Sequence, residues 1–156
     1  MKTWHLAWLI VAALSCEAKT SVAGLRERAD EGNAEAKAPV ADLRERADQG
    51  LAEAQFNLGY AYYMGEGVTQ DSVEAVKWYR KAAEQGHATA QLKLGLVYYL
   101  GDGVTQDYAE AHKWFNLSAA AGDTSAGELR DILAQKMTPE QIAEAQRLAR
   151  EWKPKE

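Results

Sequence analysis

One stretch of the chain is repeated directly, and this repeat limits the possible folds more than any other feature does. Residues 54–89 are followed without a gap by residues 90–125, and 18 of the 36 paired positions are identical. A unit of this length is one supersecondary element that cannot bury its own apolar face, so its copies must stack. We therefore expect a short solenoid, an architecture that mostly serves in binding.

The first half of each copy has the pattern of a helix that ends in a glycine loop. Ala54, Leu58 and Tyr62 recur at the spacing of one helical face, which predicts a helix, called helix A, over residues 53–64. Two glycines then break the pattern, because glycine adopts a positive φ at little cost. The paired glycines of the two copies are Gly65, Gly67, Gly101 and Gly103.

The second half of each copy carries the start and end signals of another helix, called helix B. Asp71 can accept hydrogen bonds from the free N–H groups of the first turn, and Glu74 can reach back as in a capping box. This helix is predicted over residues 72–85, and Gly86 stands where a glycine often follows a helix end. Asp107 repeats the start signal in the second copy.

Two tryptophans, Trp78 and Trp114, stand at equivalent places on helix B. Small residues such as Gly59 and Ala75 let neighbouring helices approach closely. We expect the two indoles to fill the core between layers rather than to hold a ligand.

The spacing of these residues resembles the Sel1-like repeat, a relative of the tetratricopeptide repeat. The positions that carry the resemblance in the first copy are Ala54, Leu58, Gly59, Tyr62, Gly65, Gly67, Val68, Asp71, Ala75, Trp78, Ala82, Ala83 and Gly86. The resemblance covers residues 51–122, as repeats at 51–86 and 87–122. It implies an all-α fold, a right-handed α/α superhelix that acts as a scaffold for protein–protein contacts, frequently in bacterial cell-envelope or signalling roles.

Shorter helical segments are expected to cap the array at both ends. Residues 25–36 recur as residues 43–54, a shift of half the repeat, and predict two short helices of a degenerate N-terminal cap over residues 25–50. Residues 123–153 predict a C-terminal capping helix pair. Its second helix begins at residues 138–141, where threonine, proline and glutamine hold the places of a capping box.

The start of the chain has the features of a targeting segment. Residues 1–18 combine an early positive charge, an apolar run over residues 6–14 and a small-residue cleavage region, which is typical of a signal peptide. A lipoprotein signal that ends at residue 15, with a lipid anchor on Cys16, is an alternative. The apolar run is too short for a membrane span. Residues 19–24 are expected to form a linker, and the protein to be exported to the periplasm or secreted.

Composition and motifs exclude several classes of function. The net charge of −5 argues against nucleic-acid binding, which normally requires a basic face. The three histidines form no metal motif, and the loop glycines do not extend to a phosphate-binding loop. We therefore expect no catalytic residue, no metal, no cofactor and a monomeric, non-enzymatic protein.

A partner surface is predicted on helix A, on the face that points away from its inner stripe. The residues on this face differ between the copies, and they are Asn57, Tyr60, Met64, Lys93, Leu96 and Leu100. The resemblance implies that helix A lines the concave surface, where a protein or peptide segment would lie. Alternatively, these residues only contact the adjacent repeat.

Three functions remain open at this point. The first is an exported adaptor that binds another envelope protein. The second is a cell-wall or β-lactam hydrolase, a label that some proteins with this repeat carry, although the sequence offers no nucleophile and base for it. The third is a secreted effector module that binds a host protein.

Overall fold

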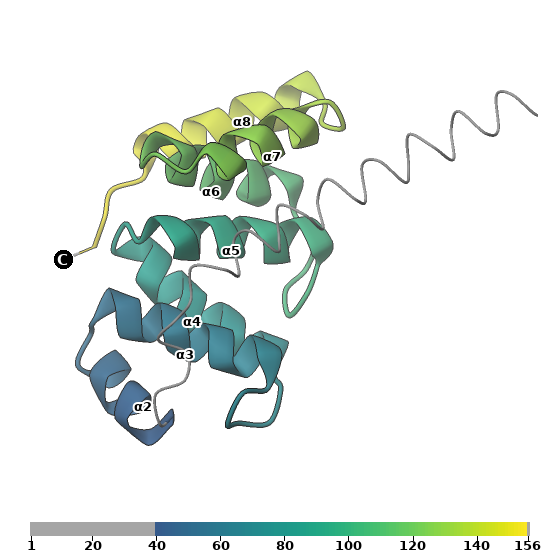
Figure 1. Cartoon of the computed structure of the whole chain (residues 1–156). Helices are drawn as coiled ribbons and strands as arrows, with labels where there is room; N and C mark the ends of the chain where they lie inside the picture. Colours follow the sequence, from purple (N-terminus) through teal and green to yellow (C-terminus); the bar gives the residue numbers. More distant parts are fainter. Residues whose placement is uncertain (1–39, 156) are drawn as a thin grey trace, which may run out of the picture. The chain divides into compact units, whose positions relative to one another are not determined.

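The computed structural model describes residues 40–155, and these residues belong to one compact unit. This part of the chain contains helices and no strand (Figure 1). The helices are α2 (Val40–Asp48), α3 (Ala52–Met64), α4 (Ser72–Glu84), α5 (Ala88–Leu100), α6 (Tyr108–Ala120), α7 (Thr124–Ala134) and α8 (Pro139–Glu151). The predicted signal peptide, Cys16, the linker and the first half of the N-terminal cap lie outside the described residues.

The helices form a stack of hairpins, which confirms the predicted all-α repeat fold. Helix A and helix B of the first repeat are α3 and α4, those of the second are α5 and α6, and each pair packs together. Helix α4 also packs on α5, and α2 packs on α3 as a preceding helix B would. The connections at residues 65–71, 101–107 and 135–138 lie on one side of the stack, here called the loop edge (Figure 1).

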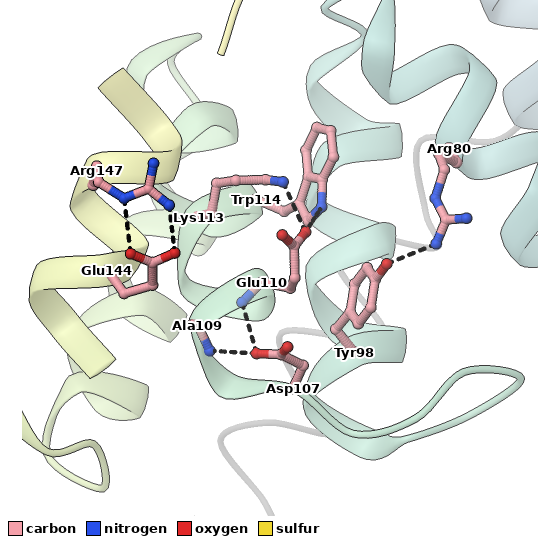
Figure 2. A network of polar contacts seen from close by, with 9 residues as sticks. All are labelled: Arg80, Tyr98, Asp107, Ala109, Glu110, Lys113, Trp114, Glu144 and Arg147. Atoms are coloured by element: carbon pink, nitrogen blue, oxygen red, sulfur yellow. Dashed lines mark hydrogen bonds and ion pairs between the residues drawn. The ribbon is translucent and has the colours of Figure 1, made fainter. Parts of the chain in front are cut away.

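Local signals set the helix ends. Gly65 and Gly101 cap α3 and α5 in the left-handed conformation, with φ of 75° and 71°. The Asp71 side chain accepts a hydrogen bond from the backbone N–H of Glu74, and Asp107 caps α6 in the same way (Figure 2). The expected capping box of α4 is wrong in one respect. The Glu74 carboxylate contacts the Nζ atom of Lys77 at 2.8 Å instead of reaching back.

Glycines inside helix A allow the two helices of a repeat to touch. A Cβ atom on Gly59 would lie 2.8 Å from the ring of Tyr79, and one on Gly95 would lie 2.5 Å from the ring of Phe115. A Cβ atom essentially never lies this close to another heavy atom, so alanine at either site would force the facing ring or the helices to shift. The aromatic ring of helix B therefore lies directly on the backbone of helix A.

The core runs through the stack and includes both predicted tryptophans. Trp78 is 6% exposed and packs with side chains of α2 and α3, and Trp114 is 4% exposed and packs with side chains of α3, α4 and α5. The expectation that these indoles are core residues is confirmed.

The C-terminal helices do not repeat the hairpin geometry of the two repeats. Helices α7 and α8 both pack against α6. Thr138 and Gln141 form the predicted capping box at the start of α8. After α8 the chain returns to the end of α4, where the backbone N–H of Lys155 donates to the carbonyl of Glu84 at 2.7 Å.

Candidate partner-binding surface

The six residues predicted to form the partner surface divide into two groups in the structure. Met64 and Leu100 are exposed, each to 46%. The other four are buried, with exposed fractions of 8% or less: Asn57, Tyr60, Lys93 and Leu96. Burial of these four agrees with the alternative that they contact neighbouring helices, and partner contact stays a prediction for all six.

Packing on two sides explains why helix A is covered so widely. Helix α3 packs against both α2 and α4, and α5 packs against both α4 and α6. Eight consecutive residues of each helix A are buried, 54–61 and 90–97. Tyr60 belongs to the core cluster, and the Nζ atom of Lys93 lies 5.7 Å from the centre of its ring. The sequence pattern, which predicts one buried stripe, therefore underestimates how much of helix A is buried.

Met64 and Leu100 are exposed because each is the last residue of its helix A. The glycine that follows turns the chain into the loop, so these side chains lie at the loop edge rather than between helices. Lys136 occupies the equivalent place two repeats after Met64. Its Nζ atom donates to the Tyr99 hydroxyl at 2.8 Å, and this hydrogen bond raises the pKa of Lys136.

The structure adds three residues to this surface that sequence reasoning missed. Glu66 and Asp102 follow the exposed apolar residue by two positions in the first and second repeat. Val73 at the start of α4 is 53% exposed, and a Cβ atom on Gly103 would lie 3.0 Å from its backbone nitrogen. The loop of the second repeat therefore lies against the start of helix B in the first. The repeated acidic position was a signal that could have indicated the first two residues.

Hydrogen bonds hold the loops in the same conformation in both repeats. The side-chain amides of Gln70 and Gln106 each donate to a helix A carbonyl at 2.8 Å. Arg80 on α4 donates to the Tyr98 hydroxyl on α5 at 2.6 Å (Figure 2). Arg44 makes the equivalent bond to Tyr62 one repeat earlier. The loop edge is thus a defined surface rather than a set of independent loops.

The described residues offer little for chemistry. None of their His, Cys, Asp and Glu side chains form a group that could hold a metal ion. An open hollow of about 400 Å³ at the loop edge is lined by Gln106, Asp107, Tyr108 and Gln141. Three of these side chains already bind backbone groups, Asp107 and Gln141 as helix caps. The hollow therefore has few polar groups left for a ligand.

Comparison with known proteins now identifies the repeat. The profile of the Sel1 repeat family matches residues 52–87 and 88–123. These bounds differ by one residue from the repeats predicted at 51–86 and 87–122. The chain is a Sel1-like repeat protein.

Solved structures of other Sel1-like repeat proteins resemble this one. A protective antigen of uropathogenic Escherichia coli strains that displays an SLR fold is 40% identical, with a TM-score of 0.71 over 72% of this chain and 24% of that protein. A Sel1 repeat protein from Oxalobacter formigenes is 49% identical, with a TM-score of 0.53 over 54% of this chain and 35% of that protein. This Sel1-like repeat protein therefore spans only 24% and 35% of their lengths. No curated protein matches the chain.

Sel1 repeats commonly serve as protein-interaction modules and are generally not enzymes. Among the helices of residues 40–155, none combines the length and apolar character that a membrane crossing requires.

Proposed function

We propose that this protein is an exported bacterial scaffold or adaptor that binds a protein or peptide partner through the helix A surface. The observation that carries the proposal is the exposure of Met64 and Leu100 at the same position of consecutive repeats. Large apolar side chains that are exposed at one edge of a protein are typical of contact sites for partners. Because the other four helix A residues are buried, the contact would begin at these two helix ends.

Export rests on the signal-like residues 1–18 and on one relative. The resemblance to a protective antigen is consistent with a protein that reaches the cell envelope or the exterior, although only 24% of that antigen is matched. Location in the periplasm, secretion and a lipid anchor on Cys16 are separate versions of this proposal. A secreted effector that binds a host protein would use the same surface. Protease accessibility in intact cells and metabolic lipid labelling of a Cys16→Ser variant would distinguish these versions.

Affinity capture tests the binding function. The immobilised full chain is exposed to a bacterial envelope extract, and the retained proteins are identified beside a Met64→Ser/Leu100→Ser variant. Leu51→Ser is the matched control, because Leu51 is 48% exposed and lies at the opposite ends of the helices. We expect a partner that the control retains and the double variant loses. Equal retention by both variants would remove the helix A ends from the binding surface.

A further inference from the structure

We propose that the loop edge recognises a protein segment in which apolar side chains are flanked by lysine or arginine. The proposal rests on the proposed binding function and names the chemistry of the partner. The surface, here called the loop-edge patch, consists of Met64, Glu66, Val73, Leu100 and Asp102. It combines exposed apolar groups with carboxylates that nothing neutralises among the described residues.

The apolar part of the patch contains most of the large hydrophobic residues that are exposed in the described part of the chain. Four large hydrophobic residues are exposed between residues 40 and 155, and three of them belong to the patch. Val73 lies beside the loop that follows Leu100, since a Cβ atom on Gly103 would lie 2.5 Å from the Ser72 carbonyl oxygen and 3.0 Å from the Val73 nitrogen. Met64 precedes the equivalent loop of the first repeat. The apolar groups thus extend across the boundary between the two repeats.

The charged part of the patch follows from which carboxylates are already engaged. Asp71 and Asp107 are helix caps, and Glu110 forms an ion pair with Lys113 at 2.7 Å, as Glu74 does with Lys77. Glu66 is exposed and Asp102 is half-buried, and neither side-chain carboxylate has an ion-pair or hydrogen-bond partner within residues 40–155. Each lies two positions after the exposed apolar residue of its repeat, so each repeat presents the same combination of one apolar and one anionic group.

Charge complementarity selects the partner. A carboxylate without a partner beside an apolar side chain favours a cationic side chain beside an apolar one, and it disfavours nucleic acid and anionic lipid. Because the combination occurs twice at equivalent positions, the partner segment would present two such pairs. The same hydrogen bond holds each loop to its own helix A, so the two loops present their carboxylates in the same local conformation.

The charge prediction is tested with labelled synthetic peptides and the full chain. The probe is a helical peptide of leucines and lysines, compared with peptides that replace lysine by glutamate or leucine by serine. Fluorescence anisotropy should show binding of the leucine–lysine peptide alone, and weaker binding at higher salt. The Glu66→Gln/Asp102→Asn variant should bind it about fivefold more weakly. Glu45→Gln/Asp48→Asn on α2 changes the net charge equally and should leave the affinity unchanged.

The contribution of the apolar residues is tested with the same leucine–lysine peptide. Met64→Ser/Leu100→Ser should weaken binding about tenfold, whereas Leu51→Ser should not. Equal losses in patch and control variants would show non-specific attraction and overturn the proposal. Patch-dependent binding to vesicles of phosphatidylglycerol, with no peptide binding, would assign the patch to membranes and also overturn it. Retention of extract proteins could require Met64 and Leu100 but not Glu66 and Asp102. That result would support the scaffold function and contradict the proposal that the partner segment is basic.

Discussion

Gln55 and Gln91 occupy the same place in the two repeats, yet their side-chain amides are satisfied differently. Both donate from Nε2 to a carbonyl of the preceding helix B at 3.2 Å. The Oε1 atom of Gln55 also accepts from Gln85 at 2.8 Å, whereas the buried Oε1 atom of Gln91 has no partner among the described residues. The difference arises because Ala121 stands where the first repeat has Gln85.

Restoring that donor should stabilise the second repeat. The backbone of Ala121 has φ and ψ of −81° and 1°, almost those of Gln85 at −83° and 0°, so a glutamine can adopt the same position. We expect Ala121→Gln to raise the free energy of unfolding by about 0.5–1.5 kcal/mol, the usual net value of one hydrogen bond. Urea denaturation measures the change, and Gln85→Ala should lower stability by a similar amount. A less stable Ala121→Gln variant would contradict the assignment.

His112 on α6 gives the protein a dependence on pH. Its side chain is only 4% exposed. Burial lowers the pKa of His112, the Arg130 guanidinium lowers it further, and the Asp131 carboxylate opposes this shift. Below about pH 6.5, the usual histidine pKa, the unfolded chain therefore takes up a proton more readily than the folded chain does. Stability should fall as the pH drops from about 7.5 to 5.5. His112→Val, which copies Val76 of the first repeat, should reduce this fall in denaturation experiments, and an unchanged fall would exclude His112 as its cause.

At the scale of the helices, the sequence predicts what local chemistry decides. Asp71, Asp107 and Thr138 cap helices because their side chains accept from N–H groups two or three residues away. The glycine ends of α3 and α5 are equally local. These signals need no knowledge of neighbouring helices, so they could be located from spacing alone.

Features that depend on distant packing could not be predicted in this way. Burial of Tyr60 and Leu96 depends on helices that cover α3 and α5 from both sides, and one apolar stripe does not indicate the second neighbour. The docking of α8 on α6 and the return of Lys155 to Glu84 also depend on contacts far apart in the sequence. Three of the five residues of the loop-edge patch, Glu66, Val73 and Asp102, became visible only when the unengaged carboxylates and the position of the Gly103 loop were known.

The C-terminal segment after α8 should stabilise the stack mainly through one side chain. The Trp152 ring meets the Trp114 ring edge-on at 6.4 Å between centres, and it also packs against Gly86. We expect Trp152→Ala to cost about 1–3 kcal/mol, below the ~3–5 kcal/mol of a fully buried tryptophan. Lys155→Ala should cost less than about 1 kcal/mol, because its ion pair with Glu84 is exposed and its backbone hydrogen bond remains. Thermal unfolding compares the two, and equal losses would contradict this ranking.

For the molecule as a whole, the core joins the two repeats. One cluster contains Phe56 and Tyr79 from the first repeat with Leu94 and Trp114 from the second, and Trp152 packs against it. Solenoids hold together through contacts between neighbouring repeats, and long arrays can unfold in parts. Here the two repeats share this cluster, so each repeat relies on the other to bury part of its apolar core. A second cluster joins Leu58 and Trp78 of the first repeat to α2.

Residues 40–155 should therefore unfold in one transition, and damage to either repeat should shift that transition as a whole. Gly59→Ala and Gly95→Ala place a Cβ atom within 2.8 Å and 2.5 Å of the facing rings, and within 3.1 Å and 3.2 Å of helix B carbonyls. Because the carbonyls cannot move aside, we expect each change to cost about 1–3 kcal/mol. This loss outweighs the ~1 kcal/mol that alanine gains over glycine in a helix.

Circular dichroism and tryptophan fluorescence should give coincident unfolding curves for each variant. The comparison is informative because Trp78 and Trp114 belong to different repeats. A curve with two steps, in which Gly95→Ala lowers only one of them, would instead show that the repeats fold separately. The scaffold would then be a pair of independent modules, and the loop-edge patch, which extends over both, would have no fixed geometry. A single transition keeps the patch intact up to the unfolding of the stack.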